Sequence, residues 1–113
     1  MTPRITDEYM QQMRDRTHPY TIMLLRKTAK RSEPGADAIV WEHGRRNHAL
    51  RVDGKLAIVC PIRDHDQWAG LGIFDTTVEE ARAIMDEDPG VQAGIFTYEL
   101  LPTRSFPGDA LPG

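Results

Sequence analysis

The sequence has a single cysteine, no long apolar run and no excess of positive charge. Cys60 has no partner for an internal disulfide, which favours a reducing compartment, so we expect a soluble, cytoplasmic protein. No stretch approaches the roughly 20 apolar residues that cross a bilayer, and the first ten residues lack the pattern of a secretory signal. The 17 acidic and 14 basic side chains give a formal charge of −3, which disfavours nucleic acid as a partner.

The length of 113 residues suits one compact domain. Thr6 is a candidate cap for a short helix running to Arg14. Between residues 36 and 53, apolar or neutral side chains recur with the 3.6-residue period of a helix that has one buried face, and Gly54 follows as a natural stop. Thr77 and Glu80 have the spacing of a capping box that opens another helix, and Asp88-Pro89-Gly90 should break it.

Four segments have the composition of strands: residues 20–25, 55–60, 68–74 and 95–101. Together with the two longer helices they give the order β-α-β-β-α-β, which predicts an α+β, ferredoxin-like sandwich with an extra N-terminal helix. We expect three parts: a helical extension over 1–17, the main domain over 18–105, and a tail over 106–113.

The predicted strands are apolar on both faces, although two helices can cover only one face of a four-stranded sheet. In the first strand Tyr20, Ile22 and Leu24 alternate with Thr21, Met23 and Leu25. A second copy of the chain, packed sheet to sheet, is an economical cover for the other face, with the N-terminal helix as a partial alternative. We therefore expect a homodimer.

His43 is the most informative single residue, because the periodicity places it on the buried face of its helix. A buried histidine is often just a ring satisfied by one hydrogen bond, and an Asp before Pro-Gly, such as Asp88, is an ordinary turn former. From the residues alone, both of these structural explanations stay open.

Four further residues are candidates for binding a small ligand. Asn47 lies on the same helix face as His43, Trp41 and Tyr98 carry rings that could stack on a planar molecule, and Cys60 ends a strand. Aromatic side chains in small domains are more often part of the core, and a lone thiol is more often inert. No metal site, phosphate-binding loop or nucleophile elbow is expected, and no cofactor is implied.

Three segments in order resemble the YciI-like (YCII-related) family. These are the helix carrying His43 eleven residues before Gly54, the strand that ends in a small residue followed by proline at Cys60-Pro61, and the run from Glu79-Glu80-Ala81 through Asp88-Pro89 to Ala93-Gly94. The resemblance spans roughly residues 20 to 102. Cys60 replaces the family's usual glycine, so we expect an added side chain in the pocket wall, and residues 1–17 fall outside the comparison.

The resemblance implies a dimeric α/β barrel with a pocket between helices and sheet, and an acid–base pair formed by His43 and Asp88. It implies a small-molecule lyase or isomerase, similar to a dehydrochlorinase or to muconolactone isomerase. Two alternatives remain at this point: a non-catalytic module that binds a metabolite, and a structural dimer in which His43 only satisfies a hydrogen bond. A His43–Asp88 contact beside an open cavity would exclude the structural dimer.

Overall fold

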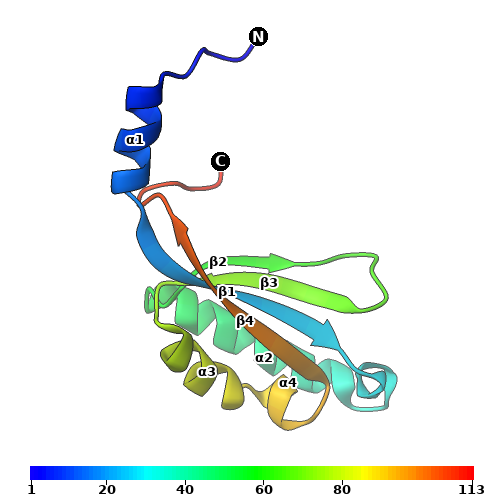
Figure 1. The fold of residues 1–113 in the computed structure, drawn as a ribbon. Helices are drawn as coiled ribbons and strands as arrows, with labels where there is room; N and C mark the ends of the chain where they lie inside the picture. The colour runs from blue at the N-terminus through cyan, green and yellow to red at the C-terminus, as the bar shows by residue number, and fades with distance from the viewer.

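The computed structural model describes residues 1–113 and contains one four-stranded sheet with helices on one face (Figure 1). The elements are α1 (Asp7–Asp15), β1 (His18–Lys27), the 3-10 helix η1 (Ala29–Ser32), α2 (Ala36–Val52), β2 (Leu56–Pro61), β3 (Trp68–Phe74), α3 (Val78–Asp86), α4 (Pro89–Gln92) and β4 (Phe96–Ser105). The strands are ordered β2-β3-β1-β4, and each neighbouring pair is antiparallel. This is the ferredoxin-like arrangement, so the predicted α+β fold is confirmed.

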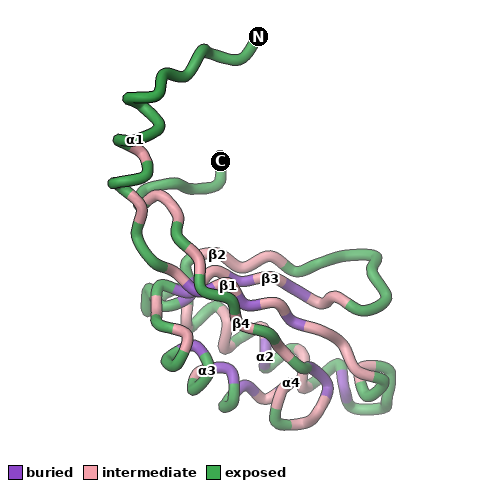
Figure 2. Tube along the Cα trace, in the orientation of Figure 1, coloured by how far each residue is buried: buried purple, intermediate pink, exposed green.

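The core lies between the sheet and the helices α2 and α3. In β1, Thr21, Met23 and Leu25 are buried and the residues between them are half-exposed, as the pleat of a strand requires. Phe74 and Leu56 from neighbouring strands and Met85 from α3 are the largest fully buried apolar side chains. Figure 2 shows the buried positions gathered in this layer.

The helix-start signals of the sequence are confirmed in the structure. The Thr6 side chain accepts a hydrogen bond from the Tyr9 backbone and caps α1, and Thr77 and Glu80 form the capping box of α3. Gly54 follows α2 with a φ of +82°, a conformation that glycine adopts without the steric cost of a side chain. Local signals therefore fix the ends of these helices.

The segment after α3 differs from the sequence prediction. Asp88-Pro89-Gly90 does end the preceding helix, but it also opens α4, with Asp88 as the N-cap and proline in the first turn. Proline suits this position because its missing N–H would have no partner there. The short helix α4 places the Asp88 carboxylate inside the molecule, where an ordinary surface turn would leave it exposed.

The two ends of the chain extend beyond the sandwich. The strand β4 continues to Ser105, four residues past the predicted end, and pairs with β1 as far as His18. The helix α1 stands away from the sheet at the end of this ribbon, and none of its residues is buried (Figures 1 and 2). None of the helices is both long enough and apolar enough to cross a membrane.

Candidate functional site

His43 and Asp88 meet inside the molecule. The ring of His43 projects from α2 towards the sheet, and its Nδ1 atom lies 2.7 Å from Oδ1 of Asp88. The two residues are 7% and 1% exposed. An ionised carboxylate can only accept hydrogen bonds, so the proton of this bond belongs to Nδ1 of His43. The other ring nitrogen, Nε2, is then left with a free electron pair.

The backbone of α4 holds the Asp88 carboxylate in place. Its second oxygen, Oδ2, accepts hydrogen bonds from the backbone N–H groups of Gly90 at 2.9 Å and Val91 at 3.1 Å. Gly90 has no room for a side chain, since a Cβ atom there would lie 2.6 Å from the ring of Phe96. The Phe96 ring in turn lies 4.9 Å from the His43 ring, centroid to centroid. Gly90 thus acts on both His43 and Asp88: its backbone N–H holds the carboxylate, and its lack of a side chain leaves room for the Phe96 ring beside His43.

Arg46 supplies positive charge behind the pair. One terminal guanidinium nitrogen lies 3.9 Å from Oδ1 of Asp88, and this nitrogen is buried without a hydrogen-bond partner. The distance is too long for a hydrogen bond, but attraction between buried charges acts over this range. Arg46 therefore places a positive charge beside the Asp88 carboxylate.

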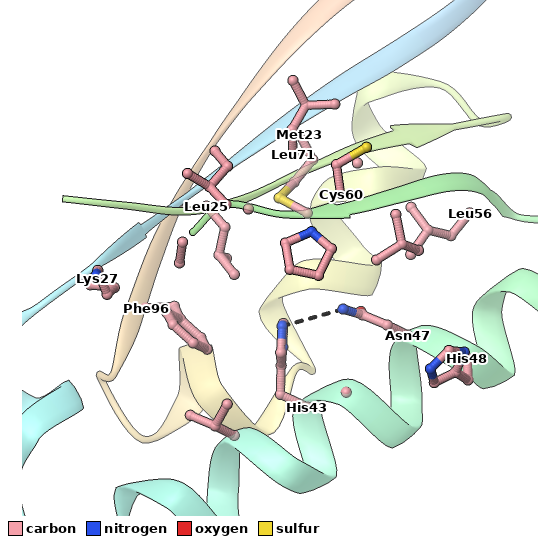
Figure 3. Close-up of a pocket in the computed structure, with 18 of the residues that line it drawn as sticks. Met23, Leu25, Lys27, His43, Asn47, His48, Leu56, Cys60, Leu71 and Phe96 are labelled. Carbon is pink, nitrogen blue, oxygen red and sulfur yellow. Dashed lines mark hydrogen bonds between the residues drawn. The ribbon is translucent and has the colours of Figure 1, made fainter. Parts of the chain in front are cut away.

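A pocket of about 380 Å³ opens between α2 and the strands β1, β2 and β3, and His43 forms part of its wall. The lining is mainly apolar and includes Met23, Leu25 and Phe96. In Figure 3 the His43 ring rises from α2 towards the strands, and the amide nitrogen of Asn47 lies 3.3 Å from Nε2. Because Nδ1 carries the proton, the Asn47 amide is the donor to Nε2. A proton donor on a ligand could take its place.

Of the predicted ligand-binding residues, Asn47 and Cys60 border the pocket. The sulfur of Cys60, however, points away from His43 to the far side of the strands (Figure 3), so the expected extra side chain in the pocket wall is absent. The cause is an irregularity in β2: Leu56 pairs with Phe74 and Ile58 with Ile73. The extra residue reverses the alternation of side chains beyond it.

Trp41 and Tyr98 do not line the pocket. Trp41 lies two residues before His43 on α2, where the helical period turns it to the opposite side, and it is 70% exposed. The Tyr98 hydroxyl donates a hydrogen bond to Asp86 at 2.5 Å, at the end of α3. Burial and this hydrogen bond raise the pKa of Tyr98 above its ordinary value of 10.0.

Sequence reasoning missed four residues at the site: Arg46, Gly90, Lys27 and Arg31. Lys27 and Arg31 line the pocket, and Arg46 and Gly90 act on Asp88. The proline after Asp88 was a usable signal for Gly90, because it is also typical of a helix start. No signal in the sequence points to the other three. The structure contains no cluster of three or more side chains able to hold a metal ion.

Comparisons with known proteins agree with this fold. The family model of the YCII-related domain matches residues 20–104. Among solved structures, the 5-chloro-2-hydroxyhydroquinone dehydrochlorinase from Burkholderia phenoliruptrix AC1100, in complex with 2,5-dihydroxybenzoquinone, superposes with a TM-score of 0.50. It is 14% identical in sequence, and the match covers 76% of this chain and 92% of that chain. No curated protein matches the sequence.

Proposed function

We propose that this chain, which belongs to the YCII-related domain family, is a small-molecule lyase or isomerase that needs no cofactor. His43 would move a proton, and Asp88 would orient its ring. The observation that carries the proposal is the 2.7 Å contact between Nδ1 of His43 and Oδ1 of Asp88, beside a pocket that His43 lines. The contact beside a pocket argues against a purely structural dimer.

The chemistry follows from the tautomer that Asp88 enforces. The Nε2 electron pair takes a proton from an O–H or C–H group of the substrate, and the resulting imidazolium is stabilised by the carboxylate at Nδ1. Return of the proton to a different substrate atom completes an isomerisation. In an elimination a leaving group such as chloride departs with its bonding electrons, and the imidazolium then gives its proton to water.

The structural neighbour guides the choice of test substrates. Its name states that it removes hydrogen chloride from 5-chloro-2-hydroxyhydroquinone, and it was solved with 2,5-dihydroxybenzoquinone. We propose a small cyclic or aromatic substrate here too, since the pocket of about 380 Å³ is in the size range of small-molecule sites. Chloride release from the chlorinated hydroquinone and isomerisation of muconolactone are the two reactions to assay.

The deciding experiment compares His43→Asn with His18→Asn. His18 also lies near an aspartate, Asp75, at 3.6 Å, but both side chains are about half exposed, so this pair is a matched control outside the pocket. We expect His43→Asn to lower turnover by about 10²–10⁴-fold while ligand binding persists, and His18→Asn to keep full turnover. Equal turnover in the two variants would refute the proposal. Binding without turnover in the unsubstituted protein would indicate the metabolite-binding module instead.

We also propose that two copies pair through the helix-free face of the sheet. One row of apolar side chains crosses all four strands on this face: Ile58, Ile73, Ile22 and Leu101 lie opposite one another in turn. Residues of the C-terminal tail border the row, yet Leu101 remains 48% exposed. An apolar row of this extent is typical of a contact surface.

Light scattering after size-exclusion chromatography tests the pairing. We expect a particle of twice the chain mass, and a monomer for Ile22→Asp, because a carboxylate in the middle of the row would be buried without a partner. Val52→Asp is the control, since Val52 is 89% exposed at the end of α2. A monomeric unsubstituted protein would contradict the proposal. Placement in the cytoplasm stays a prediction from the sequence.

A further inference from the structure

We propose that the ligand of the His43 pocket is an anion, and that its acidic group is held by Lys27 and Arg31, the two cationic residues that line the pocket. An anion is thus the substrate class for the proposed function. The inference rests on that function because it takes the same pocket as the binding site. A planar carboxylate, sulfonate or acidic phenol fits the description.

The charges around the pocket are the first argument. The chain as a whole is acidic, with 17 acidic and 14 basic side chains. The charged residues that line the pocket are nevertheless Lys27 and Arg31, and the lining contains no aspartate or glutamate. A cavity with low-dielectric walls and charge of one sign concentrates ligands of the opposite sign. The one acid of the site, Asp88, lies behind the His43 ring and is not part of the lining.

Lys27 is available to a ligand. It is the last residue of β1, and its ammonium group donates one hydrogen bond, to the backbone carbonyl of His65 at 2.5 Å. Lys27 takes part in none of the ion pairs of the structure. An ammonium group has three donors, so two remain for an anion.

Arg31 is paired, but weakly. Its guanidinium donates to Asp37 at 2.8 Å, and the Asp37 side chain is 93% exposed. An ion pair with so exposed a partner contributes little, on the order of 0–1 kcal/mol. The guanidinium also has five donors and uses one of them for this bond. A ligand anion can therefore bind Arg31 without first breaking a strong interaction.

The middle of the pocket suits a ring. Figure 3 shows Lys27 and His48 at opposite ends, with Phe96 and His43 between them. On the sheet side Gly70 lines the pocket without a side chain, and a Cβ atom at this position would lie in ordinary van der Waals contact with the Cys60 carbonyl oxygen at 3.4 Å. A ligand with its acidic group at Lys27 would therefore lay its body over Phe96 and bring a remote atom to Nε2 of His43.

The test uses two fluorescent dyes of one ring system, the anionic anilinonaphthalene sulfonate and the neutral N-phenylnaphthylamine. We expect the unsubstituted protein to bind the sulfonate at least about tenfold more tightly, the worth of a hydrogen bond between charged groups. The double variant Lys27→Met, Arg31→Gln should lose most of this preference, and Lys27→Arg should keep it. Gly70→Leu, which fills the pocket, should abolish binding of both dyes.

The outcomes separate this inference from the proposed function. Equal affinity for the two dyes, no binding of either, a preference that survives the double variant, or binding that survives Gly70→Leu would each overturn it. His43→Asn should lose turnover and keep the preference for the anion. A protein that turns over substrate without any charge preference would reject the inference alone, and anion-selective binding without turnover would reject the proposed function alone. Circular dichroism of each variant checks that it is folded.

Discussion

Asp86 and Asp88 lie two residues apart, and each accepts a short hydrogen bond from an aromatic side chain. Asp86 binds the Tyr98 hydroxyl at 2.5 Å and Asp88 binds Nδ1 of His43 at 2.7 Å. Asp86 is exposed, whereas Asp88 is 1% exposed and also accepts two backbone N–H groups. The length of a hydrogen bond therefore does not identify a site. Burial, further partners and an adjacent cavity do.

The largest difference between the two carboxylates should appear on replacement by asparagine. Asp88→Asn removes the acceptor of the Nδ1 proton and leaves a buried network partly unsatisfied, so we expect a loss of about 2–4 kcal/mol in the free energy of unfolding. Asp86→Asn keeps an acceptor at an exposed position and should change the free energy of unfolding by less than about 0.5 kcal/mol. Urea denaturation of both variants measures the difference.

Nitrogen NMR of the His43 ring tests the same two variants independently, because it shows which ring nitrogen carries the proton. In the unsubstituted protein the proton should reside on Nδ1 when the ring is neutral. In Asp88→Asn the backbone N–H groups of Gly90 and Val91 keep the amide oxygen as their acceptor, so the amide NH2 group faces Nδ1 as a donor. The ring proton should therefore move to Nε2, while Asp86→Asn should leave the tautomer unchanged. Equal costs of unfolding together with an unchanged tautomer would show that the two carboxylates are equivalent.

A smaller loss of stability is expected on substitution of Gly90. This residue donates its backbone N–H to Asp88, and Asp86 has no such glycine beside it. In Gly90→Ala the new methyl group would lie 2.6 Å and 2.9 Å from two ring carbons of Phe96. Overpacking of this kind costs about 1–3 kcal/mol, and the shifted Phe96 ring should disturb the His43 signals. Denaturation and NMR spectra measure both effects.

Gly44→Ala is the control for this substitution. Gly44 is also helical, in α2, and apart from its chain neighbours and the nearby backbone of its own helix no atom lies within 4 Å of an added Cβ. Alanine is a better helix former than glycine by about 1 kcal/mol, so this variant should be more stable than the unsubstituted protein. Destabilisation of the same size at both glycines would rule out the clash with Phe96 as the cause.

The sequence predicted the elements better than the site, because local patterns determine helices and strands. The spacing in α2 placed His43 inwards, and the family resemblance paired it with Asp88. The helical period indicates that Trp41, two residues from His43, faces the other way, whereas an aromatic ring by itself says nothing about the direction of the side chain. The Cys60 side chain was placed wrongly because an irregularity in strand pairing leaves no trace in composition. The contacts of Lys27, Arg31 and Arg46 depend on tertiary packing.

The smallest effect concerns the ionisation of Tyr98. Burial and the hydrogen bond to Asp86 raise the pKa of Tyr98 above 10.0, so the fold favours the protonated phenol. The stability from this preference is fully present below the unfolded pKa and is lost as the pH rises through the higher pKa of the folded state. Asp86→Asn removes the negative charge and should lower the pKa of Tyr98 partway, since burial remains, and Asp88→Asn should leave it unchanged.

Ultraviolet absorbance during an alkaline titration follows this ionisation, and the Tyr98→Phe variant isolates the Tyr98 signal from those of Tyr9 and Tyr20. A pKa that moves equally in the two asparagine variants would mean that the carboxylates share one electrostatic environment. A pKa of Tyr98 that changes in Asp86→Asn alone would mean that the two carboxylates have separate environments. The exposed Asp86–Tyr98 pair and the buried Asp88–His43 pair would then be independent, although only the turn into α4 lies between the two aspartates. The position of Asp88 as the cap of α4 is the physical reason to expect the separation, because the cap directs its carboxylate inwards to His43.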